Sequence, residues 1–318
     1  MPLLHTPTEV SPKARPLAAP AWLQTGAVQR VRRALVPYLF ILPFFVVLLI
    51  FLAYPLGYAF DLSLYRTQLV GGTKFIALQN YVQVFHDPYF WAGVRNMVIF
   101  GSIQVPIMLG LALLFALLLD SGIPRLRRVL RLGYFLPFAV PSAVAALMWG
   151  SLYGQSFGPI AQIAHALHFG TPGFLTERGI LPSIGNVVTW QYTGYNMIIM
   201  FAALQAIPPD LYEAARIDGA RDWQIALRIK IPLITPAIVV TCIFSIIGTL
   251  QLFSEPQIFQ AAAPSAVSEF ITPNLYVYTL AFTDQEVNYA AAVAFALGLV
   301  IALLSSLFLF VVYRRRAR

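Results

Sequence analysis

Residues 288–313 read NYAAAVAFALGLVIALLSSLFLFVVY without one charged side chain, and Arg314-Arg315-Arg316 follow directly. At ~1.5 Å per residue a helix of this length exceeds the ~30 Å hydrocarbon core of a bilayer. The whole sequence has the same character, because 59% of its 318 residues are hydrophobic and only 11% are charged. Soluble domains carry about 25% charged residues. The composition therefore predicts an all-α integral membrane protein.

Apolar blocks of similar length recur along the chain. They predict six membrane spans, at about 37–57, 96–119, 132–152, 183–207, 237–254 and 288–313. Residues 1–33 are Pro-rich and basic and are expected to form a disordered tail before a transmembrane domain at 34–313. Residues 153–182 are expected to be an irregular loop and residues 255–287 an acidic loop. Residues 314–318 form a basic C-terminus.

The basic residues predict the orientation of the spans. Of the 21 lysines and arginines, all but Arg66, Lys74, Arg95 and Arg178 lie in the N-terminal tail, after the second span, in 208–236 or at the C-terminus. Cytoplasmic loops carry the excess of Lys and Arg. Both termini are therefore expected in the cytoplasm, and the net charge of +8 reports topology rather than nucleic-acid binding.

The chain lacks an energy source of its own. The six predicted spans hold no Asp, Glu, Lys or Arg between their ends, which argues against coupling through buried ionisable groups. A phosphate-binding loop needs Gly-x-x-x-x-Gly-Lys-Ser/Thr, and Lys13, Lys74 and Lys230 do not follow glycine. Energy is therefore expected from a partner. Cys242 is the single cysteine, so no internal disulfide is possible.

The most charged segment between two spans reads PPDLYEAARIDGA at 208–220. Asp210 and Glu213 have the spacing of a capping box, which predicts a helix that begins at Leu211. Gly219 can adopt the left-handed conformation that ends a helix. The pattern predicts a short helix closed by a sharp bend.

Two alanines give this helix a face almost without side chains. Ala214 and Ala215 would let a partner surface approach closely, and a second helix is expected from about Asp222 to Pro232. The residues alone leave two interpretations open. The segment is either a compact knob that docks on a partner, or an amphipathic hairpin whose basic side chains bind lipid phosphates.

The segment resembles the EAA loop in permease subunits of binding-protein-dependent ABC importers. The resemblance lies in Glu213-Ala214-Ala215, Asp218-Gly219-Ala220, Ile229, Pro232 and Pro236. The chain departs from the family at Ala226, where a bulky residue is usual. Outside the loop, Tyr54-Pro55, Asn80-Tyr81 and Asp87-Pro88 are similar to the sugar branch, which includes the maltose and glycerol-3-phosphate transporters.

This resemblance implies a type I importer permease of the bacterial inner membrane that works by alternating access. The loop would be the coupling helix, seated in a groove of the cytoplasmic ATPase, through Glu213, Ala214, Ala215, Asp218, Gly219, Ala220 and Pro232. The implied partners are a second permease, two ATP-binding subunits and an extracytoplasmic solute-binding protein. The chain itself would bind no cofactor, because ATP and Mg²⁺ belong to the ATPase.

A sugar site needs hydrogen-bonding groups beside flat aromatic faces. Gln191 and Tyr195 are four residues apart and share a helix face, as do Ser245 and Thr249. In the family the sugar is held by the two spans that flank the loop, and the matching positions here are Gln191, Tyr192, Tyr195, Ser245, Thr249 and Leu252. The alternative is an interfacial aromatic belt with hydrogen bonds between helices.

Other functions find less support in the residues. His165 and His168 have no acidic or cysteine partner nearby, so no metal site is predicted. The sequence shows no Ser/His/Asp order and no pair of carboxylates that would indicate an enzyme. A purely structural membrane anchor would not need the short helices expected at 208–232. A non-sugar solute such as a glycerophosphate ester and a secondary carrier remain the alternative functions.

The topology can be tested with single cysteines in a Cys242→Ser background. Cysteines at Arg127 or Ala220 should be shielded from an impermeant thiol reagent in intact cells. Cysteines at Lys74 or Ala262 should react. Labelling of Arg127→Cys from outside would refute the predicted orientation.

Overall fold

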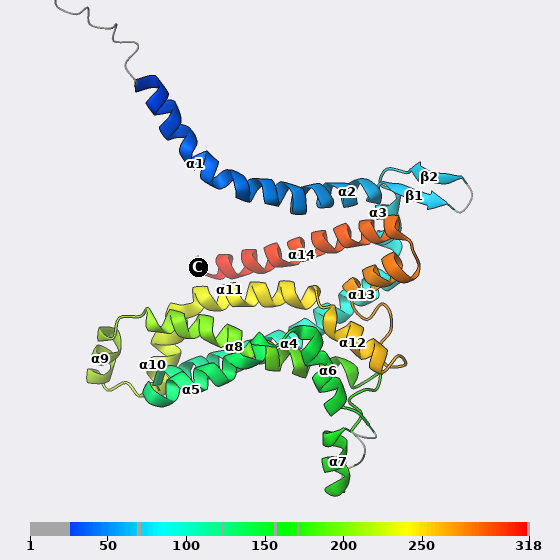
Figure 1. The fold of residues 1–318 in the computed structure, drawn as a ribbon. Helices are drawn as coiled ribbons and strands as arrows, with labels where there is room; N and C mark the ends of the chain where they lie inside the picture. Colours follow the sequence, from blue (N-terminus) through cyan, green and yellow to red (C-terminus); the bar gives the residue numbers. More distant parts are fainter. Residues whose placement is uncertain are drawn as a thin grey trace, which may run out of the picture. The chain divides into compact units, whose positions relative to one another are not determined.

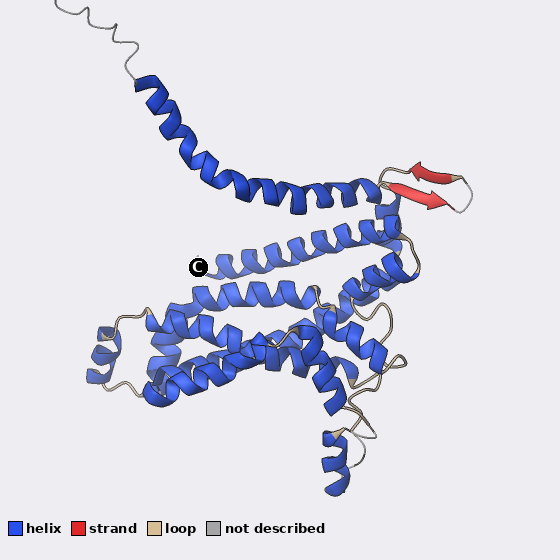
Figure 2. Cartoon of the chain, in the orientation of Figure 1, coloured by secondary structure: helices blue, strands red, loops and turns tan. Residues whose placement is uncertain are grey.

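The computed structural model describes residues 26–68, 71–121, 124–155, 158–168, 170 and 172–316, and these are mainly helical (Figure 2). The chain divides into two compact units, residues 1–58 and 59–318. In the first unit, α1 (Gly26–Leu48) passes into the π-helical η2 (Leu49–Ala53) and then into α2 (Tyr54–Ser63), whose last residues belong to the second unit. The helix thus begins inside the range predicted as a tail, whose residues 1–25 lie outside the described part.

The second unit holds the remaining elements. A two-stranded antiparallel hairpin, β1 (Tyr65–Gln68) and β2 (Gly72–Phe75), departs from the all-helical prediction. The helices that come after it are α3 (Gln79–His86), α4 (Pro88–Ser121), α5 (Pro124–Phe135), η3 (Leu136–Ala139), α6 (Ser142–Leu152), α7 (Pro159–Ala166), α8 (Ile180–Gln205), α9 (Asp210–Ile217), α10 (Asp222–Ile225), η4 (Ala226–Lys230), α11 (Ile231–Leu250), α12 (Ser254–Ala262), α13 (Pro273–Tyr278), η5 (Thr279–Thr283) and α14 (Val287–Arg316).

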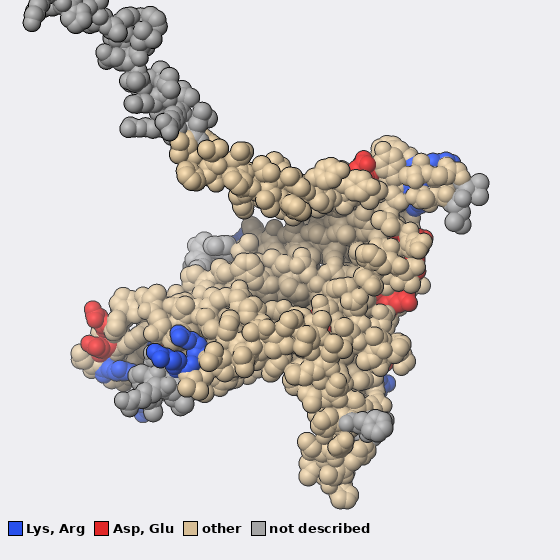
Figure 3. Space-filling model, in the orientation of Figure 1, with Lys and Arg blue, Asp and Glu red and all other residues tan. Residues whose placement is uncertain are grey.

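Four long helices of this unit run side by side. α4, α8, α11 and α14 form the bundle, with α9 and α10 at one end and the hairpin, α3 and α13 at the other (Figure 1). Charged side chains gather near these two ends, and the face between them is almost free of charge (Figure 3). This distribution suits a protein whose middle lies in hydrocarbon.

The helices long and apolar enough to cross a membrane agree with most predicted spans. Within the described residues they are Val36–Ser63, Pro88–Ser121, Asp222–Ala262 and Val287–Val312, and the bent pair Arg128–Ala139 and Ser142–Leu152 makes a fifth. The predicted fourth span corresponds to α8, whose 26 residues are long enough but include amides that make it less apolar. Six spans fit this fold, although length and composition identify only four or five.

The third predicted span is not a continuous helix. Its two halves meet at 95° between Ala139 and Ser142. Pro137 lies in the short 3-10 turn η3 and Pro141 directly precedes α6. Proline has no N–H to donate and clashes with the preceding turn, so two prolines four residues apart break the helix. The span predicted at 132–152 is therefore broken into two helical halves.

The two predicted loops also contain helices. α7 lies within 153–182, while α12, α13 and the π-helical η5 lie within 255–287. These segments are short, so their apolar residues are too few to show a helical period in the sequence. The core explains why they fold, since Phe259 of α12 and Leu275 of α13 are fully buried against α4, α6 and α14.

A single aspartate connects three helices at the end of the bundle that carries the hairpin. The Asp87 carboxylate accepts hydrogen bonds from the Tyr276 hydroxyl at 2.7 Å and the Tyr289 hydroxyl at 2.6 Å. It also accepts the backbone N–H of Tyr89 at 2.9 Å, in the first turn of α4. Asp87-Pro88 thus begins α4 and attaches it to α13 and α14.

The bend in the third span is held against α8 at two points. Gln191 of α8 donates its side-chain N–H to the Val140 carbonyl at 2.6 Å, inside the break. Gly194, one turn further on, faces the carbonyl of Tyr134 so closely that an added Cβ would lie 1.7 Å from that oxygen. Only glycine permits this approach of α5 to α8.

We expect Gly194→Ala to lower the free energy of unfolding by about 3 kcal/mol, because a backbone carbonyl cannot move aside as a flexible side chain can. The measurement is unfolding of the purified protein in mixed detergent micelles. Gly298→Ala in α14 is the matched control, since nothing lies within 4 Å of its added Cβ. Equal stability of the two variants would show that the close approach is absent.

Candidate functional site

A cavity of about 500 Å³ lies among α4, α8, α11, the bend after α5 and the start of α12. Its walls combine aromatic rings with neutral polar groups. Five of the six side chains that the sequence predicts to bind substrate line it, namely Tyr192, Tyr195, Ser245, Thr249 and Leu252. The cavity thus brings together residues from both helices that flank the segment 208–236.

Gln191 is the exception among the predicted residues. It is 2% exposed, does not line the cavity, and directs its amide N–H to Val140 instead. Its Oε1 has no hydrogen-bond partner within the described structure. The spacing placed Gln191 and Tyr195 on one helix face. In the structure, Tyr195 lines the cavity, whereas Gln191 points toward the bend.

An aromatic group forms one wall of the cavity. Phe138 of η3 stacks on Tyr195 with ring centroids 4.7 Å apart and an angle of 19° between the planes. Tyr192 meets the same Phe138 ring edge-on at 5.8 Å. Such a wall offers flat apolar faces beside two phenolic hydroxyls.

Amide side chains add further hydrogen-bonding groups to the lining. Gln104 of α4 is 5% exposed and donates to the Thr189 hydroxyl at 3.3 Å, while its Oε1 has no partner within the described structure. Asn196 donates to the Tyr192 carbonyl at 3.0 Å. The cavity can therefore offer both donors and acceptors to a neutral polar solute.

The lining residues that were not predicted as ligands include Gln104, Phe138, Ser142 and Glu255. Phe138 and Ser142 reach the cavity because the chain bends between them, and the prolines at 137 and 141 were the available signal. Gln104 is one of the few amides in an otherwise apolar span. Glu255 lies one residue beyond the predicted end of the fifth span, and charged residues are common at the ends of membrane spans.

The segment after α8 forms a second candidate site. α9 begins at Asp210, one residue before the predicted start, and its N-cap is Pro209 without a side-chain hydrogen bond. The predicted capping box between Asp210 and Glu213 is therefore wrong. Pro209 restricts the backbone directly before the helix. Both acids lie in the first turn, where their negative charges interact favourably with the positive end of the helix dipole.

The end of α9 is a Schellman motif. Gly219 has φ of +80°, its N–H donates to the Arg216 carbonyl at 3.0 Å, and the Ala220 N–H donates to the Ala215 carbonyl at 2.9 Å. These two bonds match the pattern in which a left-handed glycine closes a helix. The bend predicted at Gly219 is confirmed.

Apolar and small side chains of α9 are exposed on the protein surface. Ile217 is 86% exposed and Leu211 is 45% exposed. Glu213, Ala214 and Asp218 are also exposed. Among the other predicted coupling residues, Ala215 and Ala220 are half-buried and Pro232, in the first turn of α11, is exposed.

The expected second helix does not end at Pro232. α10, η4 and α11 follow one another without a gap, so a helical path continues from Asp222 to Leu250. Pro232 stands in the first turn of α11, directly after the π-helical η4, where its missing N–H removes one backbone hydrogen bond from this path. The segment is thus joined directly to a membrane span.

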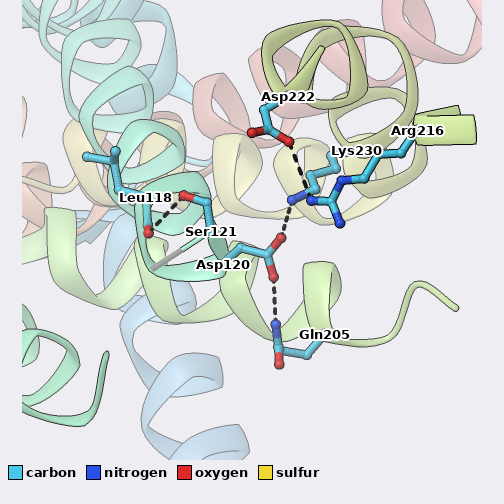
Figure 4. Close-up of polar contacts among 7 residues, drawn as sticks. All are labelled: Leu118, Asp120, Ser121, Gln205, Arg216, Asp222 and Lys230. Carbon is cyan, nitrogen blue, oxygen red and sulfur yellow. Dashed lines mark hydrogen bonds and ion pairs between the residues drawn. The ribbon is translucent and has the colours of Figure 1, made fainter. Parts of the chain in front are cut away.

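Polar contacts attach this segment to the ends of α4 and α8. Lys230 forms an ion pair with Asp120 at the end of α4, and Gln205 at the end of α8 donates to the same carboxylate at 2.7 Å (Figure 4). The Lys230 and Asp120 side chains are only 15% and 9% exposed. An exposed ion pair at 3.4 Å joins Arg216 to Asp222 across the Gly219 bend.

Tyr212 connects α9 to this ion pair. The Lys230 ammonium lies 4.9 Å from the centre of the Tyr212 ring. Burial raises the pKa of the Tyr212 hydroxyl above its ordinary value, and the neighbouring Asp120 carboxylate adds to the rise. The ring therefore stays neutral and offers its face to the ammonium.

The chain belongs to a known family of membrane transport subunits. Residues 108–318 match the family of binding-protein-dependent transport system inner membrane components. It is therefore a multi-pass membrane protein of that family.

Two relatives illustrate the family. The lactose transport system permease protein LacF of Rhizobium radiobacter is 36% identical over 278 residues, which cover 85% of this chain and 91% of LacF. The trehalose/maltose transport system permease protein MalF of Thermococcus litoralis is 32% identical over 76% of this chain and 83% of its own length.

A solved structure has the same fold. One chain of a bacterial ABC transporter involved in the import of the acidic polysaccharide alginate superposes with a TM-score of 0.78 at 20% identity, over 91% of this chain and 98% of that one. The type I importer permease architecture expected from the sequence is thereby confirmed.

We expect Gln191→Leu to lower the free energy of unfolding by about 1–3 kcal/mol, because it leaves the Val140 carbonyl without a donor. Ser245→Ala, which trims a side chain on the cavity wall, is the control and should leave stability within about 0.5 kcal/mol. The measurement is again unfolding in mixed micelles. If Gln191→Leu left the stability unchanged but abolished the response to substrate, Gln191 would be a substrate-binding residue and would not hold the bend.

Proposed function

We propose that this chain is the membrane-spanning permease subunit of an ATP-binding-cassette importer and that it conducts a carbohydrate. The single observation that carries this proposal is the cavity between α8 and α11, because these helices flank the exposed segment α9–α10. A solute site and a coupling site thus share the same two helices.

The cavity wall supports a carbohydrate as the solute. Pyranose rings pack on flat aromatic faces, which Tyr192, Tyr195 and Phe138 supply. The hydroxyl groups of the sugar need hydrogen-bond donors and acceptors, which Gln104, Asn196 and Ser245 supply. Lactose and trehalose or maltose, the solutes in the names of LacF and MalF, are neutral molecules of this kind.

Coupling would pass through α9. Its exposed Leu211, Ala214 and Ile217 would enter a groove of an ATP-binding subunit, while the Gly219 bend fixes the angle to α10. Movement of the subunit would then reach α4, α8 and α11 together, because Lys230, Asp120 and Gln205 connect their ends. The partner subunit would bind ATP and Mg²⁺, and this chain would bind neither.

The proposed assembly contains this chain, a second permease, two ATP-binding subunits and an extracytoplasmic binding protein that delivers the solute. Both termini and the segment 208–236 would face the cytoplasm. The basic residues around this segment support that orientation through the positive-inside rule. The hairpin, α3 and α13 would then face outward.

The test is ATP hydrolysis by the complete importer in nanodiscs. Addition of its binding protein with a neutral disaccharide, maltose or lactose, should stimulate hydrolysis. We expect Gly219→Val to reduce this stimulation to near the basal rate. Nothing lies within 4 Å of an added Cβ there, so the effect arises from the left-handed backbone alone.

Gly219→Asn is the matched variant, because asparagine tolerates the left-handed region far better than valine. It should retain most of the stimulation. Full stimulation in Gly219→Val would remove the bend from the coupling mechanism. Failure of every neutral carbohydrate tried to stimulate the wild type would refute the carbohydrate assignment.

A further inference from the structure

The cavity contains one ionisable carboxylate. Glu255 stands in the first turn of α12 and is 3% exposed, and its side chain belongs to the cavity lining. Among the described residues that line the cavity there is no lysine, arginine or histidine. The charge of this wall is therefore negative or zero, and never positive.

This carboxylate has no cationic partner in the described structure. The two ion pairs there, Arg216–Asp222 and Lys230–Asp120, lie at the other end of the bundle. A buried charge without a partner is costly to the fold, and within membrane proteins such groups mark solute pathways. Packing alone does not require an acid here, because a glutamine has nearly the same shape.

Position strengthens the case for a role in solute selection. α11 ends at Leu250 and α12 begins at Ser254, so Glu255 lies just after a break in the helical path. The same break contributes Gln251, Leu252 and Phe253 to the lining. A solute in contact with Thr249 or Tyr195 would therefore share its cavity with the carboxylate.

We propose that Glu255 sets the charge selectivity of the cavity, which accepts neutral or amino-bearing carbohydrates and rejects uronates, sulfonates and phosphate esters. In its ionised form the carboxylate repels an anion in the cavity, and no basic group among the described lining residues compensates. This inference rests on the proposed function for the cavity as the solute path. It separates this chain from the alginate importer, whose cargo is acidic.

The potential in the cavity can be measured without knowledge of the natural solute. The complete importer carries Ser245→Cys in a Cys242→Ser background, in nanodiscs without a membrane potential. Two thiosulfonate reagents of similar size are compared, the cationic trimethylammonium-ethyl and the anionic sulfonatoethyl reagent. Each modification rate is divided by the rate with a free thiol in solution.

We expect the normalised rate of the cationic reagent to exceed that of the anionic reagent by about tenfold. One ionised carboxylate nearby attracts the cation and repels the anion to about this extent at the dielectric constant of a partly hydrated cavity. Glu255→Gln should bring this ratio close to one, and Glu255→Asp should retain most of it. Glu269→Gln makes the same chemical change at an exposed position outside the cavity and should leave the ratio unchanged. Gly248→Cys provides a second reporter on the same wall.

An unchanged ratio in Glu255→Gln, at both reporters, would overturn the inference. So would an equal loss in Glu255→Asp, because that variant keeps the charge. The outcome is separable from the test of the proposed function. A complex that responds to no carbohydrate but shows the Glu255-dependent ratio would refute the carbohydrate and keep the charge selectivity.

Discussion

A helix that breaks inside a membrane leaves backbone carbonyls that lipid cannot satisfy. The chain meets this constraint at the bend between α5 and α6, where Gln191 supplies the missing donor and Gly194 allows α8 to come close. The bend in turn brings Phe138 and Ser142 into the cavity. The aromatic wall, the position of Tyr195 and the shape of the cavity all depend on this one contact between α8 and the broken span.

The two ends of the bundle are held by different chemistry. At the end with the hairpin, Asp87 accepts hydrogen bonds from two tyrosines and so fixes α4 to α13 and α14. At the other end, Asp120 is shared by Lys230 and Gln205, which joins α4 to η4 and α8. Both carboxylates are largely shielded from solvent, and the second belongs to the ion pair with Lys230.

Much of this fold could be predicted, because long apolar blocks and basic flanks are properties of the local sequence. The Gly219 bend was also predictable, since its signal is a single residue at a helix end. Helical spacing places Gln191 on one face with Tyr195, but it does not reveal that the Val140 carbonyl accepts the Gln191 amide N–H. Glu255 escaped notice because only the break after Leu250 turns a residue near a span end into a cavity wall. Contacts between distant segments decided both.

The π-helical turn η4 has a consequence for the spacing of the chain. A π turn holds one more residue than an α turn, and each added residue rotates the remainder of an α-helix by about 100°. The π turn therefore absorbs one residue between Asp222 and Ser245 without changing the angular phase between α10 and α11. Deletion of one residue from Ala226–Lys230 would convert the π turn to an α turn and leave that phase unchanged. Within this segment a change of one residue alters the type of helix, whereas the same change in the α-helical turns of α11 would rotate the cavity wall by about 100°.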